Sequence, residues 1–115
     1  MALPINLELI TATIASGQAL SAAVNLGAKT LVGVAMPAAW DVADLSFQVS
    51  VDGGTTWLEF SDGALVSRTV AAGQFLSLDP SLFAGVNAIK VRSGSAASAV
   101  NQSADRALGL AVKPA

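Results

Sequence analysis

Residues 44–51 read Asp-Leu-Ser-Phe-Gln-Val-Ser-Val, and polar and apolar side chains alternate along the whole stretch. The apolar positions, which begin at Leu45 and end at Val51, fall on one side of an extended chain. This period of two is typical of a half-buried β-strand with one face on the core. An Asp-Gly-Gly turn signal follows at residues 52–54 and favours a hairpin. The stretch therefore predicts an antiparallel β fold.

Runs of the same kind recur along the chain, separated by turn signals rich in glycine and aspartate. Further strands are predicted over residues 6–15, 19–26, 29–36, 57–60, 65–70, 74–78, 86–92 and 106–113. In the last of these, Leu108, Leu110 and Val112 form the apolar face. Short strands at this spacing predict a single all-β domain over residues 1–115, an antiparallel β-sandwich or barrel of about eight strands.

Three segments outside these strands carry their own predictions. Residues 1–6 are a candidate N-terminal arm that reaches a neighbour, with a frayed terminus as the alternative. Pro80–Phe83 is expected to form one short helical turn with Asp79 as its N-cap. Residues 93–104 are rich in Ser, Ala and Gly and are expected to form a long, flexible surface loop.

The strand predicted over residues 29–36 is apolar on both faces. Strict alternation puts Leu31, Gly33 and Ala35 on one face and Val32, Val34 and Met36 on the other. A strand that is apolar on both faces is covered on both. The second cover comes either from another subunit or from the chain's own loops, and the sequence leaves both readings open.

Composition argues against several classes of function. The chain has no cysteine and no histidine, so it lacks disulfides, thiolate zinc sites and a histidine base. Charged residues are 12% of the chain and the formal net charge is −2, which gives no basic surface for nucleic acid or an anionic membrane. The first residues show no secretory signal. We expect a soluble protein made in the cytoplasm, without enzymatic activity, cofactor or metal.

The same composition bears on self-association. The 115 residues include 23 alanines and 14 charged side chains, whereas monomeric proteins usually spread both signs of charge densely over their surface. Permanent interfaces between identical subunits resemble a core cut in half. A weakly charged, alanine-rich surface therefore favours a homo-oligomer.

One local motif is specific. Residues 50–57 read Ser-Val-Asp-Gly-Gly-Thr-Thr-Trp and match S-x-D-x-G-x-T-W, which resembles the Asp-box hairpin of sialidases and other β proteins. Asp52 is expected to accept backbone N–H groups in the turn, and Gly54 to take positive φ. Thr56 is expected to begin the return strand, and Trp57 to fold onto the hairpin. The resemblance implies a structural turn, and it does not carry over sialidase activity, because that propeller repeats the motif over a much longer chain.

Two pairs of acidic residues lie close together: Asp41 with Asp44, and Asp52 with Asp62 across a hairpin. Neither pair has the D-x-[DN]-x-[DN]-G spacing of a calcium loop. The four Phe and two Trp residues are few to shape the sugar cleft that a carboxylate pair would need in a glycosidase. We expect these carboxylates to cap turns.

Trp40 is the candidate partner contact. It follows a predicted strand in the segment Pro-Ala-Ala-Trp-Asp at residues 37–41. An exposed loop tryptophan stacks on a sugar or anchors a protein contact. The alternative is an indole folded over the end of the sandwich core, where aromatic rings are usually buried.

A broader resemblance covers residues 17–112. The carrying stretches are residues 17–37, residues 40–57 from Trp40 through the Asp-Gly-Gly-Thr-Thr-Trp motif, Leu-Asp-Pro at 78–80, Phe-Ala-Gly at 83–85 and Ile-Lys-Val-Arg-Ser-Gly at 89–94. Together they resemble small virion proteins of tailed bacteriophages and prophages.

That resemblance implies a capsid decoration, or cement, protein with a jelly-roll sandwich. Such a protein is made in the bacterial host cytoplasm, binds the outer capsid surface of the virion as a homotrimer and stabilises the shell. The implied partners are the major capsid protein and further copies of the chain, and no catalytic residues are implied. The alternative is a phage fibre, tail or carbohydrate-binding sandwich that recognises a host glycan.

Overall fold

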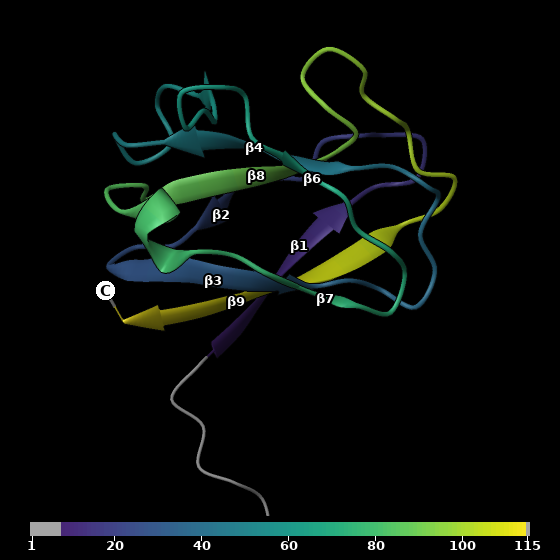
Figure 1. The fold of residues 1–115 in the computed structure, drawn as a ribbon, viewed down its shortest axis with the longest axis horizontal. Helices are drawn as coiled ribbons and strands as arrows, with labels where there is room; N and C mark the ends of the chain where they lie inside the picture. Colours follow the sequence, from purple (N-terminus) through teal and green to yellow (C-terminus); the bar gives the residue numbers. More distant parts are fainter. Residues whose placement is uncertain (1–7, 115) are drawn as a thin grey trace, which may run out of the picture.

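The computed structural model describes residues 8–114, which form nine strands and one short helix (Figure 1). The elements are β1 (Glu8–Ile14), β2 (Val24–Asn25), β3 (Lys29–Ala35), β4 (Leu45–Ser50), β5 (Leu58–Glu59), β6 (Ser67–Arg68), β7 (Phe75–Ser77), the 3-10 helix η1 (Pro80–Phe83), β8 (Ala88–Ser93) and β9 (Arg106–Pro114). Each lies within or overlaps a predicted element. The candidate arm at residues 1–6 lies outside the described residues.

The strands form two antiparallel sheets. Sheet A has the order β1-β9-β3-β7, and sheet B has the order β2-β8-β4-β5 with β6 also on β4. β5 and β6 pair with successive parts of the same edge of β4, so they share one strand position. Outside the β4–β6 group, each connection crosses from one sheet to the other, which is the double-sheet jelly-roll arrangement (Figure 1). The prediction of an all-β, jelly-roll-like sandwich is confirmed.

The core lies between the two sheets. Leu45, Phe47 and Val49 of β4 are buried, as their alternation predicted. Phe47 packs edge-on against the rings of Phe60 and Phe83, with ring centroids 6.3 and 5.6 Å away. Such edge-to-face aromatic pairs add stability beyond their buried area. The alternation ends at Ser50, so Val51, predicted to face the core, lies in the turn with 59% of its surface exposed.

Strand β9 pairs on both sides, with β1 and with β3. Leu108, Leu110 and Val112 are fully buried, which confirms the face predicted for this strand. Between them, Ala107, Gly109 and Ala111 point away from the core. Because partners in an antiparallel ladder share a face, the outward residues of β1 and β3 lie beside them.

The strict alternation predicted for residues 29–36 is wrong. The register of β3 against β9 shifts between Leu31 and Gly33, which is a β-bulge at Val32. The extra residue returns Val34 and then Met36 to the core, on the same side as Leu31. Strand β3 therefore buries residues from both predicted faces.

The strand predicted over residues 19–26 is reduced to Val24–Asn25, plus an isolated bridge from Leu20 to Arg92. Ser21 explains the break. Its hydroxyl accepts the Val91 N–H at 2.9 Å, in the place of a backbone carbonyl. Side-chain bonds of this kind compete with a regular ladder.

Two of the three irregular segments have described geometry. Pro80–Phe83 forms one 3-10 turn, and Oδ1 of Asp79 accepts the Ser81 N–H at 3.0 Å, so the predicted cap is confirmed. The loop over residues 94–105 has no helix. It is tied to the sandwich where Val100 N–H donates to Ser93 O and Gln102 N–H donates to Gln18 O, both at 2.9 Å.

Gly33→Ala is expected to destabilise the fold. A Cβ at this position would meet the Phe75 ring and would lie 2.7 Å from the Leu76 carbonyl oxygen, so backbone must shift. Overpacking of this kind costs roughly 1–3 kcal/mol, measurable by urea unfolding. The matched control is Gly109→Ala on the same face, whose Cβ would meet nothing nearer than the Ala35 methyl at 3.3 Å. Equal midpoints for the two variants would contradict the steric account.

Candidate functional site

The hairpin of residues 50–57 is built as the Asp-box resemblance implied. Oδ1 of Asp52 accepts the Thr56 N–H at 2.9 Å and the Ser50 hydroxyl at 2.8 Å. The Ser50 hydroxyl oxygen in turn accepts the Gly54 N–H at 2.8 Å, and Gly54 has φ of +94°. These contacts close the turn between β4 and β5. The sequence predicted that the return strand begins at Thr56, and this is wrong. The strand begins at Leu58, because residues 55 and 56 still belong to the turn.

Trp57 folds back onto this hairpin. One atom of its indole ring lies 3.7 Å from the position of a Cβ on Gly54. The Lys90 ammonium lies over the ring, 4.5 Å from its centroid, in a cation–π contact with the neighbouring β8. The ring therefore packs within the chain on sheet B.

Trp40 is half-buried and packs against the core. Its indole N–H donates to the Ala43 carbonyl oxygen at 3.2 Å, within its own loop. The ring thus lies over the end of the sandwich. The same loop exposes Val42, a large apolar side chain with 96% of its surface accessible.

Gln102 is the residue that sequence reasoning missed, and it fixes the loop that holds Trp40. Its side chain is fully buried. Oε1 accepts from the Asp41 N–H at 2.9 Å and from Nε of Arg106 at 3.1 Å. Nε2 donates to the Asp41 carbonyl at 3.1 Å and to the Ser93 hydroxyl at 2.7 Å. No local pattern marks a loop glutamine for burial, because Asp41, which it binds through two hydrogen bonds, lies 61 positions away in the sequence.

Asp41 completes this network. Its carboxylate accepts the Ser103 N–H at 2.7 Å and pairs with Arg106 at 3.0 Å. Hydrogen bonds from the Ser103 hydroxyl and N–H, and then the Arg106 charge, hold the pKa of Asp41 below its usual value. The network joins the loops before β4 and before β9 into one rigid end of the sandwich.

The outer side of sheet B is polar. Arg92 is mostly buried there and forms a bidentate pair with Glu59, with N–O distances of 2.7 and 3.1 Å. The Arg92 Nε donates to Ser46, and the Gln48 amide donates to Glu59, each at 2.9 Å. The hydrogen bonds from Arg92, more than those from Gln48, lower the pKa of Glu59.

The outer side of sheet A differs in kind, because Lys113 near the end of β9 is the charged residue on it, and we call the part without charge the uncharged face. It consists of Leu9, Thr11, Thr13, Gly33, Ala35, Phe75, Ser77, Ala107, Gly109 and Ala111, placed side by side by the register of the four strands. None of these residues is charged. Leu9 on β1 and Phe75 on β7 are 65% and 57% exposed. On β9 and β3, which lie between these two strands, the outward residues of the face are glycine and alanine. The sequence showed that β3 has apolar residues on both sides. It did not show that the outward residues of β3 join those of β1, β7 and β9 in one continuous face.

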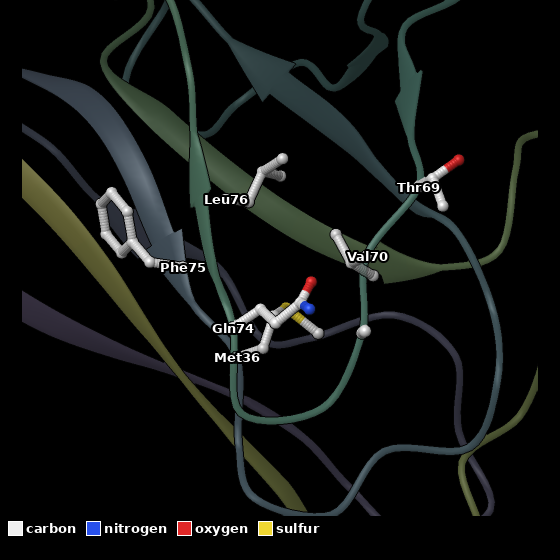
Figure 2. Close-up of a pocket in the computed structure, with 7 residues that line it drawn as sticks. Met36, Thr69, Val70, Gln74, Phe75 and Leu76 are labelled. Atoms are coloured by element: carbon white, nitrogen blue, oxygen red, sulfur yellow. The ribbon is translucent and has the colours of Figure 1, made fainter.

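We consider three depressions on the surface of residues 8–114. The first, about 60 Å³, lies beneath the loop before β7, where Met36, Val70 and Leu76 converge while Phe75 points to the other side of its strand (Figure 2). It has room for about two waters. The others, about 150 and 300 Å³, flank η1, and the charged side chains that line them are Lys29 and Lys113. These lining residues offer no acid–base pair. Within residues 8–114, no three His, Cys, Asp or Glu side chains gather as a metal site.

Comparison with known proteins adds no relative. No protein-family model, no curated protein and no solved structure matches the chain. Across residues 8–114, no helix has both the length and the apolar character needed to cross a membrane.

Asp52→Asn is expected to change the pH dependence of stability. The Thr56 N–H and then the Ser50 hydroxyl lower the pKa of Asp52 from 3.8 to about 2. The folded state therefore favours the carboxylate, and this stability is fully present above the unfolded pKa and lost as the pH falls through the folded one. The difference in Tm between the native protein and Asp52→Asn should be constant near neutral pH and should shrink below about pH 4.

The control for this series is Asp44→Asn, which removes an exposed carboxylate that forms no side-chain hydrogen bond within residues 8–114. Its Tm should run parallel to that of the native protein. A gap between native protein and Asp52→Asn that stays constant down to about pH 2 would contradict the assignment.

Gln102→Leu should destabilise the sandwich by about 2–4 kcal/mol, because it leaves the part-buried Asp41 N–H and the Nε–H of Arg106 without their acceptor. Urea unfolding measures the loss. The matched control is Gln18→Leu, an exposed glutamine whose side chain forms no hydrogen bond within the described part of the chain, with an expected change below about 0.5 kcal/mol. Similar losses in both variants would mean that the buried network has no special role.

Proposed function

We propose that the chain is a structural virion protein, a decoration or cement protein that binds the outer capsid surface as a homotrimer and stabilises the shell. Its partners in this proposal are the major capsid protein and two further copies of itself. The observation that carries it is the uncharged face of sheet A, which suits contact with protein better than contact with water.

The chemistry of that face supports self-association. The fully buried centre of an interface between proteins is depleted of charge and enriched in aromatic side chains. Phe75 and Leu9 supply large exposed apolar groups, and their side chains lie against Gly33 and Gly109 of the same face. Sheet B presents the opposite chemistry, with the Arg92–Glu59 pair satisfied within the chain. The outer side of sheet A therefore favours contact with protein, whereas the outer side of sheet B favours contact with solvent.

Stiffness also supports a structural role. The loop that carries Val42 is held by the Asp41, Gln102 and Arg106 network rather than by loop contacts alone. A preordered surface loses less conformational entropy when it binds. A trimer presents three such surfaces at once, so modest contacts from each chain combine into high avidity on a symmetric shell.

The decisive variant is Phe75→Glu. By light scattering behind a sizing column, the unmodified protein should elute with a mass of 34.5 kDa, three times the 11.5 kDa of one chain, or a whole multiple of it. Phe75→Glu places a charge on the uncharged face, so it should lose the three-fold contact and no longer elute at the trimer mass, with an unchanged circular dichroism spectrum. It should also fail to sediment with capsids from the bacteriophage or prophage that carries the gene.

The matched control is Leu58→Glu on sheet B, where Leu58 is 53% exposed, close to the 57% of Phe75. This variant should keep both the trimer mass and capsid binding. A monomeric Phe75→Glu protein that still coats capsids at full occupancy would contradict the avidity mechanism. A native protein that elutes as a single chain would contradict the trimer.

A further inference from the structure

Strand β1 is an open edge of sheet A. It pairs with β9 along one side over all seven of its residues, from Glu8 to Ile14. On its other side, no backbone hydrogen bond from residues 8–114 reaches any of these seven residues. An edge of this kind presents a row of unpaired N–H and C=O groups that templates pairing with another chain.

This edge lacks the usual protection. The other edge positions of the two sheets are held by strands of two or three residues, namely β2, β5, β6 and β7. Proteins also block edges with proline, lysine or a bulge. β1 has none of these, and its one charge is Glu8 at the end of the strand, paired with Lys29. β1 is therefore the one long, unblocked edge among the described strands.

We propose that β1 of one copy pairs antiparallel with β1 of a second copy, about a two-fold axis through Thr11. In this register Thr11 lies opposite Thr11 of the partner copy, Leu9 lies opposite Thr13, and Ile10 lies opposite Ala12. The two four-stranded sheets become one sheet of eight strands. An axis normal to the sheet keeps the uncharged faces of both copies on the same side.

The residues of β1 fit a second copy of themselves. The two Glu8 carboxylates fall at opposite ends of the paired strands, so like charges do not meet. Leu9, 65% exposed in one chain, gains the Thr13 methyl group as a direct neighbour. Ile10, half-buried at the edge, gains Ala12. The contact also continues the uncharged face, to which Leu9, Thr11 and Thr13 already belong.

This contact is distinct from the proposed trimer, because strand pairing is two-fold and uses no part of Phe75. Alone it gives a dimer of twice 11.5 kDa, about 23 kDa, and combined with a three-fold contact it gives six chains of about 69 kDa. It does not depend on binding to a capsid.

Cysteine cross-linking tests the register directly, because the native chain has no cysteine. In Thr11→Cys the paired Cα atoms would lie about 4.5–5.5 Å apart, within the range of a disulfide. Leu9→Cys would place its two cysteines four residues apart along the strands, about 14 Å, beyond that range. Val42→Cys, at a side chain that is 96% exposed, reports random collision.

With oxidised glutathione as the oxidant, Thr11→Cys should form a disulfide-linked dimer at least about tenfold faster than Val42→Cys, because pairing holds its thiols at a high local concentration. Leu9→Cys should match the collision control, and a mixture of Leu9→Cys with Thr13→Cys should cross-link as Thr11→Cys does. Thr11→Cys should also cross-link in the Phe75→Glu background.

Thr11→Cys that reacts no faster than Val42→Cys would overturn the pairing, and Leu9→Cys that reacts as fast as Thr11→Cys would overturn the register. Loss of capsid binding or of the trimer mass while the Thr11→Cys link persists would count against the proposed function alone.

Discussion

Strand β9 organises the structure because it pairs along both of its edges, with β1 on one side and with β3 on the other. Its inward side chains, from Leu108 to Val112, are wholly buried between the sheets. The outward positions between them carry at most a methyl group. One alternating strand thus supplies the centre of the core and the floor of the uncharged face, so the stability of the sandwich and the chemistry of its outer surface are linked through the same residues.

The polar side chains of the chain act mainly on its own loops. Asp52 closes the β4–β5 hairpin, Asp41 and Gln102 join two loops at one end, and Glu59 neutralises the mostly buried Arg92. Each of these contacts has a sufficient structural reason in the hydrogen bonds that it satisfies. The outer side of sheet A is different, because its apolar exposure does nothing for the isolated chain. This apolar exposure favours contact between the outer side of sheet A and another protein.

The two contacts that we propose both use sheet A, and they differ in symmetry. A flat face without charge can meet copies around a three-fold axis, whereas an open strand edge is completed by a two-fold axis. Both leave the polar side of sheet B in solvent. Under the proposed function, a shell-binding protein would gain stiffness from the continuous sheet and avidity from repeated copies, with no need for a catalytic centre.

The sequence by itself determined the fold class, the approximate strand positions, the Asp79 cap and the Asp52 turn. These features depend on alternation, turn residues and hydrogen bonds between near neighbours, all of which are local. The tertiary structure alone decided the bulge at Val32, the burial of Gln102 and the joining of outward residues into one uncharged face. The bulge and the face depend on which distant strands pair and in which register, whereas Gln102 is buried by its hydrogen bonds to Asp41 in another loop. Pairing between residues about 75 to 105 positions apart leaves no mark on the local pattern of either strand.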